Sequence, residues 1–218
     1  MKIIKNKRLN KLFQEYQSKQ LEELATINSK LEQDNILLVS DINEYQSLYV
    51  QSLIKSNFLE YASNDILINS DWIPNDFLLR QMILGQGIYS GPTALYLWGL
   101  SDEFPYYIYM TFKMGYRLPK TYAKWTENVF TRQINRKNLQ NFVNEISVRG
   151  THNKIKLYSK ERTLVEILRE PYSLDINLVN TAYRRYLKSV NNDTNVLLKT
   201  AKSMGNFQRV LTRLELIL

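Results

Sequence analysis

Cysteine is absent from this chain of 218 residues. The absence excludes a disulfide framework, a thiolate nucleophile and a thiolate metal site, and it agrees with a reducing setting. Histidine occurs once, as His152 in an expected hairpin turn. This residue could act as a general base, but a solvated turn histidine is the simpler interpretation, and a metal site would need clustered ligands. We expect neither a metal ion nor a cofactor.

Long apolar runs are also absent, since no stretch approaches the roughly 18 residues of a membrane span. The basic N-terminus, MKIIKNKRLNKLF, lacks the apolar stretch of a signal peptide. The motifs G-x-x-x-x-G-K-[ST], G-x-G-x-x-G and G-x-S-x-G do not occur. The glycines of GQGIYSGP, residues 85–92, could cradle a phosphate or form tight turns, and we favour turns. We expect a cytoplasmic protein with no membrane partner and no small-molecule substrate.

The net charge of +8 is unevenly distributed along the chain. Residues 1–11 carry 5 basic and no acidic side chains, residues 12–79 carry 3 basic and 11 acidic ones, and residues 80–218 carry 21 and 10. The change near residue 80 predicts a boundary between a domain over 1–79 and a domain over 80–218. Basic segments of this kind bind nucleic acid or an acidic protein, or they form an ordinary solvated surface.

The first domain is expected to contain three helices and a hairpin. Apolar residues at three- and four-residue steps predict a helix over 3–33. A brief helix over 41–46, capped by Ser40 or Asp41, and a longer helix over 47–58 are expected to follow. Residues 59–70 predict two short strands around an Asn-Asp turn. This order is that of a winged helix-turn-helix.

In that interpretation the helix over 47–58 is the recognition helix, which enters the major groove of DNA. The predicted DNA contacts are its outward side chains and the basic residues near the N-terminus: Ser47, Tyr49, Gln51, Ser52, Lys55, Lys5, Lys7 and Arg8. Only one of the helix positions is a cation, whereas neutralised phosphates supply much of the affinity of DNA-binding proteins. The fold of this domain is therefore better supported than its binding to DNA.

The second domain is expected to be α+β with a C-terminal helical tail. SGPTALYLWGL predicts a buried helix that begins at the Ser90 cap and ends at Gly99, and YYIYMTF predicts a buried strand. ENVFTRQ, VNEISVRG and NKIKLYS predict three further strands, and Ser159 is expected to cap a helix over ERTLVEILRE. Three more helices are expected over 175–188, 193–203 and 206–217.

Two stretches of this domain resemble a known family. TALYLWGLSDEFPYYIYMTFKMGYRL and KLYSKERTLVEILRE look like the AbiEi family of abortive-infection antitoxins, the antitoxin halves of type IV toxin–antitoxin pairs. The family pattern is approximately a TALYLHGL helix, a strand ending in a GYR turn, and VYDxERTxxDxLR. Trp98, Ser159 and Glu166 depart from it, because the family has His, Asp and Asp there. By order and spacing the resemblance extends over residues 45–215.

The resemblance implies a regulator that is not an enzyme. An N-terminal winged helix would repress the protein's own operon by binding its operator DNA. The C-terminal domain would counteract a cognate toxin similar to nucleotidyltransferases, and in type IV systems this is often described without a stable complex of the two proteins.

Two groups of polar residues in the second domain form the expected antitoxin surface: Glu161, Arg162, Thr163, Arg184, Arg185 and Lys188. The first three open a helix directly after a strand, where Arg162 could be a bidentate donor to an acidic partner or a nucleotide. Alternatively, Arg162 and Thr163 tie the helix start to neighbouring backbone carbonyls, and we favour this structural interpretation. The cations near Tyr183 and Tyr186 suit nucleic acid, an acidic protein partner or simple solvation.

Two other functions remain open. An enzyme acting on nucleic acid or nucleotides would use the group around Arg162, but it lacks a carboxylate cluster and a histidine pair. A protein-binding module whose winged helix no longer reads DNA would explain the acidic character of residues 12–79. Every interpretation requires that two apolar seams, around Leu95 and Leu164, close into one compact body preceded by a separate head of three helices and a hairpin.

Overall fold

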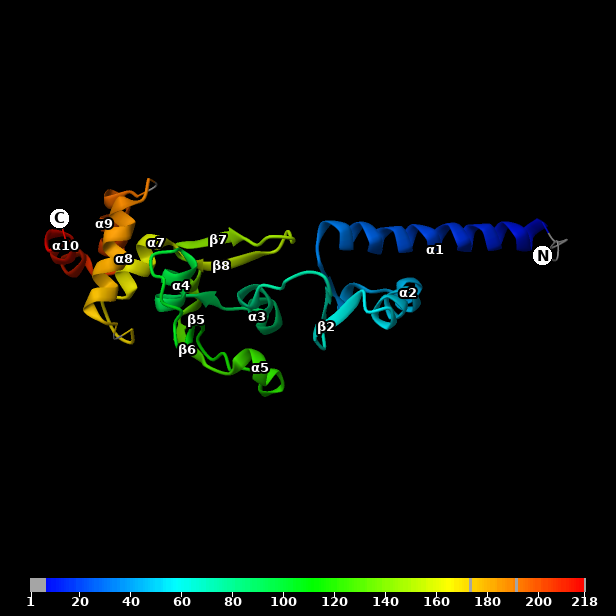
Figure 1. Cartoon of the computed structure of the whole chain (residues 1–218), viewed down its shortest axis with the longest axis horizontal. Coiled ribbons are helices and arrows are strands. Elements are labelled where there is room, and N and C mark those ends of the chain that lie inside the picture. The colour runs from blue at the N-terminus through cyan, green and yellow to red at the C-terminus, as the bar shows by residue number, and fades with distance from the viewer. Residues whose placement is uncertain (1–6, 173, 191, 218) are drawn as a thin grey trace. The chain divides into compact units, whose positions relative to one another are not determined.

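The computed structural model describes residues 7–172, 174–190 and 192–217, and it shows a mixed α+β protein with two β-sheets (Figure 1). The contacts between residues divide the chain into two compact units. Unit 1 contains Met1–Leu79 and Ser147–Lys154, and unit 2 contains Arg80–Ile146 and Ile155–Leu218. Residues 147–154 thus belong to unit 1 although the charge pattern groups them with the second half of the chain.

Unit 1 consists of a long helix, a strand, a 3-10 turn, a second helix and a hairpin: α1 (Lys7–Gln33), β1 (Ile36–Leu38), η1 (Val39–Asp41), α2 (Glu44–Lys55), β2 (Leu59–Ser63) and β3 (Ile66–Asn69). The predicted hairpin is confirmed. β3 lies between β1 and β2 and is antiparallel to both, with Leu37 opposite Leu67. The strand β1 completes the sheet at a place where no strand was expected.

The predicted brief helix over 41–46 is wrong, and so is the predicted start of the next helix. Residues 39–41 form the 3-10 turn η1, and α2 begins at Glu44. The N-cap is Asn43, whose side-chain oxygen accepts hydrogen bonds from the backbone N–H groups of Tyr45 and Gln46. The side chain of Gln46 accepts from the backbone of Asn43 in return, so a capping box sets the helix start. The described part of unit 1 therefore has two α-helices rather than three before its hairpin.

The core of unit 1 forms where α1, α2 and the three-stranded sheet meet. Its buried members are Ile27, Leu31, Leu37, Val50, Leu59 and Leu67. Within α1, only Ile27 and Leu31 are buried, so the helix contributes to the core through its C-terminal turns alone. Near the other end of α1, apolar side chains such as Leu12 and Phe13 are about half exposed.

The segment Ser147–Lys154 joins unit 1 through its backbone. The carbonyl of Gly150 accepts hydrogen bonds from the backbone N–H of Asn35 (3.2 Å) and from its side-chain Nδ2 (2.7 Å). The indole of Trp72 donates to the carbonyl of Arg149 at 3.1 Å, and Asn153 Nδ2 donates to Asp34 Oδ2 at 3.0 Å. These contacts come from residues more than 70 positions apart, so no local pattern predicts them.

Unit 2 is built on a five-stranded sheet in the order β6-β5-β4-β8-β7. The strands are β4 (Ile88–Tyr89), β5 (Ile108–Lys113), β6 (Val129–Ile134), β7 (Val143–Ser147) and β8 (Lys154–Tyr158). β4 is antiparallel to β5 and parallel to β8, and β5 is parallel to β6. The predicted strands over YYIYMTF, ENVFTRQ, VNEISVRG and NKIKLYS are confirmed, with shifts at their ends.

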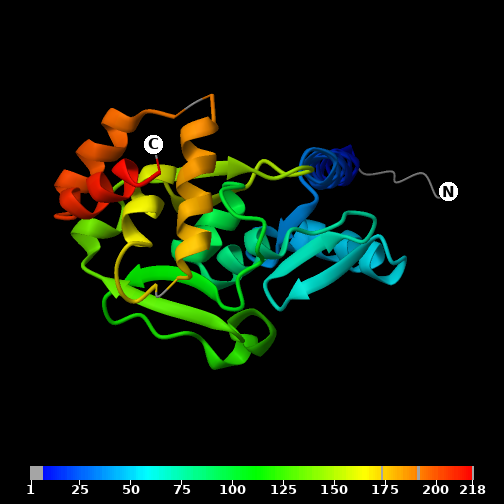
Figure 2. The ribbon, with the colours of Figure 1, turned by 60° about the vertical axis from the view of Figure 1, so that its left-hand side comes forward.

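The helices that follow Pro74 are α3 (Asp76–Leu84), α4 (Gly91–Leu97), α5 (Ala123–Thr126) after the 3-10 turn η2 (Lys120–Tyr122), α6 (Arg136–Leu139), α7 (Lys160–Glu166), α8 (Ile176–Lys188), α9 (Thr194–Ser203) and α10 (Phe207–Glu215). The three predicted C-terminal helices are confirmed within two residues at each end. Figure 2 shows α9 and α10 close together at the end of the chain. η2 and α5 were not predicted. No helix among the described residues is long and apolar enough to cross a membrane.

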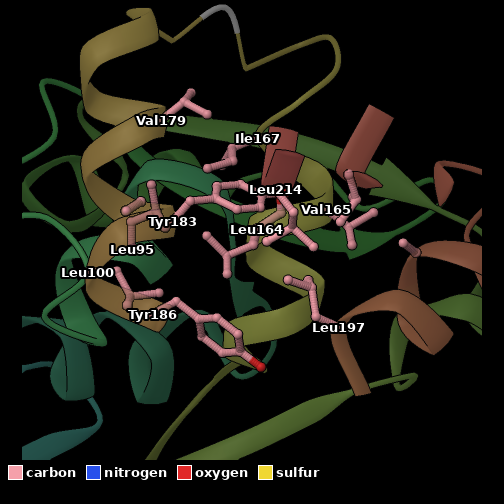
Figure 3. Packing of buried hydrophobic residues seen from close by; sticks show 13 residues of the cluster. Leu95, Leu100, Leu164, Val165, Ile167, Val179, Tyr183, Tyr186, Leu197 and Leu214 are labelled. Atoms are coloured by element: carbon pink, nitrogen blue, oxygen red, sulfur yellow. The ribbon is translucent and has the colours of Figure 1, made fainter. Parts of the chain in front are cut away.

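Leu95 of α4 and Leu164 of α7 lie in one buried cluster, so the two apolar seams do close into a single body. Figure 3 shows both side chains gathered around Tyr183 of α8, and Leu197, Val210 and Leu214 extend the cluster into α9 and α10. The hydroxyl of Tyr183 donates to the carbonyl of Leu164 at 3.0 Å, which satisfies a buried polar group inside this core.

The start of α4 is packed too tightly for any residue larger than glycine. Gly91 has φ +49°, and a Cβ built on it would lie 2.4 Å from the ring of Tyr172. Ser90 occupies the N-cap position, but its hydroxyl makes no capping bond. It accepts hydrogen bonds from Thr111 Oγ1 and the Tyr172 hydroxyl instead, so the expected capping role of Ser90 is wrong. Gly91 therefore serves close packing.

We predict that Asn43→Ala loosens α2 selectively. The substitution removes the capping box and the hydrogen bond from Asn43 Nδ2 to Glu23 on α1, and loss of an N-cap costs about 1 kcal/mol. Hydrogen–deuterium exchange read by mass spectrometry should show faster exchange in peptides over 44–55. Ser40→Ala is the matched control, because the Ser40 hydroxyl bonds only to its neighbour Asp41. Equal exchange in both variants would contradict the capping assignment.

Candidate functional site

The predicted recognition helix presents only some of its expected DNA contacts. Gln51, Ser52 and Lys55 are exposed, whereas Ser47 and Tyr49 are half-buried. The hydroxyl of Tyr49 donates to Asn28 Oδ1 on α1 at 2.6 Å, so this side chain ties the two helices of unit 1 together. The exposed residues lie at three- and four-residue steps and therefore share one face of α2.

The same face of α2 also carries an apolar side chain, Leu48, which the helical spacing predicts to be buried. Leu48 is 72% exposed, and it precedes Ser52 by one helical turn. The Ser52 hydroxyl donates to the backbone carbonyl of Leu48 at 3.0 Å. The α2 face, defined here as Leu48, Gln51, Ser52 and Lys55, therefore combines one cation with polar groups and an exposed leucine.

The structure describes two of the three basic residues predicted to contact DNA near the N-terminus, called here the basic arm. Lys7 and Arg8 open α1 and are exposed, and no acidic residue lies in the first turn of that helix. Lys5 lies outside the described residues. The basic residues of the arm and the α2 face both belong to unit 1.

Two residues of the predicted antitoxin surface are buried. Arg162 is 4% exposed and Thr163 is fully enclosed, so neither can contribute to an exposed surface. Ser159 caps α7 by accepting from the backbone N–H of Arg162 at 3.2 Å, as predicted. Thr163 Oγ1 donates to the carbonyl of Tyr158 at 3.3 Å. Thr163 and Arg162, whose contacts follow, thus hold the start of α7 to backbone carbonyls.

The guanidinium of Arg162 is surrounded by acceptors. Its Nη1 donates to the carbonyls of Asn138, at 3.1 Å, and Asn141, and its Nε donates to Glu166 Oε1 at 3.1 Å. The guanidinium carbon lies 3.3 Å from the ring centre of Tyr158, which is a close cation–π contact. A charge removed from water in this way is tolerated only because its donors are satisfied.

Glu166 forms a second ion pair, with Arg132 of the sheet. It is fully buried, and Arg132 Nη1 on β6 lies 2.9 Å from the same Oε1 that Arg162 contacts. Burial opposes the ionised form of Arg132, but Glu166 and Tyr172 together, through charge and hydrogen bonding, raise the pKa of the guanidinium. Burial also raises the pKa of the Tyr158 hydroxyl.

Arg132 was not recognised from the sequence, although a signal for it exists. The side chains of a strand alternate between the two faces of the sheet, so Phe130, Arg132 and Ile134 share a face. All three are half-buried, whereas Thr131 and Gln133 between them are exposed. A cation on the inward face of a strand requires a buried anion, and that requirement points to Glu166.

The remaining predicted surface residues lie on or near α8. Arg184 and Lys188 are exposed and stand one helical turn apart. Arg185 makes a bidentate ion pair with Asp102, and this hydrogen bonding lowers the pKa of the Asp102 carboxyl. Glu161 Oε1 accepts from the hydroxyl of Tyr186 at 3.0 Å. Of the cations in the predicted antitoxin surface, Arg162 and Arg185 form ion pairs, which leaves Arg184 and Lys188 as its exposed positive charges.

The three departures from the AbiEi pattern all lie beside α7. Trp98 donates from its indole nitrogen to the carbonyl of Tyr158 at 2.8 Å, and Ser159 forms the N-cap of the helix. Glu166 supplies the carboxylate that Arg162 and Arg132 share. Each residue that differs from the family pattern thus has a defined partner in this structure.

Among the described residues no three His, Asp or Glu side chains converge as metal ligands would. His152 is exposed in the loop between β7 and β8. Arg132 and Arg162 both contact Oε1 of Glu166. The comparison with known families finds no family that matches this chain, and no curated protein matches it.

We predict that Arg162→Met strongly destabilises unit 2. The substitution leaves the carbonyls of Asn138 and Asn141 without their donor and removes one cation from Glu166, and breaking a buried ion pair costs about 3–5 kcal/mol. Urea unfolding followed by tryptophan fluorescence, to which Trp98 and Trp125 of unit 2 and Trp72 of unit 1 contribute, should show a lower midpoint for the transition of unit 2.

The control is Arg184→Met, which removes an exposed cation from α8 and should change the free energy of unfolding by less than about 0.5 kcal/mol. Similar midpoints for the two variants would mean that the buried pair does not stabilise the unit.

Proposed function

We propose that this protein is a cytoplasmic, non-enzymatic regulator: an antitoxin of the AbiEi type IV class that represses its own operon and counteracts a nucleotidyltransferase-like toxin. The observation that carries the proposal is that the two stretches resembling this family form the centre of one core. Leu95 from the first stretch and Leu164 from the second belong to the same buried cluster. A resemblance confined to surface loops would carry much less weight.

A DNA-binding role for unit 1 is supported by the order of its elements. A helix, a strand, a short helical turn, a helix and a hairpin follow one another, and the first strand pairs with the last. In this proposal the order is that of a winged helix, with η1 in the place of the short second helix. In this proposal α2 is the recognition helix, and Lys7 and Arg8 contact phosphates.

We predict that Lys55→Glu weakens binding to the DNA upstream of the protein's own gene. Lys55 is the cation of the α2 face, and the loss of one phosphate contact should reduce the salt dependence of binding by about one unit of log–log slope. Gel shifts at several salt concentrations measure this slope. Lys120→Glu, the same change at an exposed site in unit 2, should leave it unaltered.

A protein-binding role for unit 1 is the second candidate, and Leu48 favours it. A leucine that is 72% exposed in the middle of the α2 face suits a protein partner better than a phosphate backbone. The gel shifts separate the two candidates, because the absence of any shift with the full-length protein at low salt would remove the repressor role.

We predict that the α8 cations Arg184 and Lys188 contribute to neutralising the toxin. Both are exposed and stand one turn apart, so they present two positive charges to an acidic partner. Arg184→Glu combined with Lys188→Glu should reduce the growth rescue seen when the protein is co-expressed with its toxin. Lys113→Glu combined with Lys120→Glu makes the same change of charge elsewhere on unit 2 and should leave rescue intact. Full rescue by both pairs would contradict the assignment of this face.

A further inference from the structure

A pocket of about 540 Å³ opens in unit 2 beside the buried pair Arg162 and Glu166. Its lining also includes Arg132 of β6 and Arg169, which follows α7. Phe142 and Met204 provide apolar surface. Three guanidinium groups therefore face one carboxylate in a single concave site.

The positive charge of this pocket exceeds what the protein itself neutralises. Arg162 is satisfied by two carbonyls and by Glu166, and Arg132 shares the same carboxylate oxygen. Arg169 is half-buried, and its Nε is enclosed without a hydrogen-bond partner among the described residues. Because three guanidinium groups share one carboxylate here, the pocket favours an anion that reaches Arg169 and Arg132 together.

The carboxylate of Glu166 also has an unused acceptor. Both arginines contact Oε1, whereas Oε2 is buried and has no hydrogen-bond partner among the described residues. Buried acceptors are rarely left without a donor. A ligand that fits this pocket should therefore carry a hydroxyl or amino group as well as an anionic group.

The apolar surface of the pocket suits a flat ring. Phe142 is 41% exposed and has φ +56°, a left-handed conformation that is strained for an aromatic residue. The structure maintains this conformation from both sides: the carbonyl of Phe142 accepts from the backbone N–H of Ser159 at 2.7 Å, and the carbonyl of Asn141 accepts from Arg162. The strain thus fixes an aromatic ring beside the charged groups, with the thioether of Met204 also in the lining.

We propose that unit 2 binds a nucleotide in this pocket. The phosphates contact Arg169 and Arg132, a hydroxyl or amino group donates to Glu166 Oε2, and the base lies against Phe142. A sugar phosphate would satisfy the charges but not the aromatic surface, and a nucleoside would satisfy the aromatic surface but not the charges. The inference goes beyond regulation of an operon, because it gives this unit a small-molecule ligand.

The test is isothermal titration calorimetry of the full-length protein with ATP, GTP, CTP and UTP, each alone. Adenosine and pyrophosphate are titrated as controls, because adenosine carries the base without phosphates and pyrophosphate carries the phosphates without a base. At least one nucleoside triphosphate should bind more tightly than either arm. Arg169→Gln should weaken that binding about tenfold or more, because hydrogen bonds to a charged group are lost. Arg117→Gln removes an exposed cation elsewhere in unit 2 and should leave binding unchanged.

Arg169→Lys keeps the charge but loses the fork of donors, so its affinity should fall between those of the wild-type protein and Arg169→Gln. Thermal unfolding without ligand shows whether each variant is folded before it is titrated. The proposal is overturned if no nucleotide binds, if pyrophosphate binds as tightly as the triphosphates, or if folded Arg169→Gln binds as well as the wild-type protein. None of these outcomes depends on whether unit 1 binds DNA.

Discussion

The burial of one guanidinium group organises the centre of unit 2. Arg162 at the start of α7 is shielded from water, so every donor that it carries must find an acceptor inside the protein. The acceptors are the carbonyl of Asn138 in α6, the carbonyl of Asn141 just after that helix, and Glu166 one turn further along α7. This single requirement holds α6 and the loop after it to α7.

The helix α7 has only seven residues, yet it is buried on every side. Arg162 and Glu166 lie one turn apart and face the charged cluster, whereas Leu164 and Val165 face the apolar core shared with α4, α8 and α9. A short helix that is apolar or paired all round belongs to the interior of a protein. The same element therefore lies between the core and the nucleotide pocket that we propose.

Much of the fold was predictable because its signals are local. Ser159 caps α7, Gly99 follows α4 in a left-handed conformation, and the alternating residues of 59–70 form a hairpin. The prediction was wrong where two local signals competed. Ser40, Asp41 and Asn43 are all good N-caps, and the structure uses Asn43 because Gln46 three residues later completes a capping box and also bonds to Glu23 of α1.

The sequence by itself determined most of the helices and strands and the structural role of Arg162, because each depends on residues a few positions apart. Only the tertiary structure decided which groups are buried and whom they contact. In the folded protein Arg162 is buried, and Arg132 forms an ion pair with Glu166, 34 positions further along the chain. Tyr49 donates a hydrogen bond to Asn28, and residues 147–154 belong to unit 1. A buried charge or polar group needs a partner, and that partner can come from any part of the chain that folding brings within hydrogen-bonding distance.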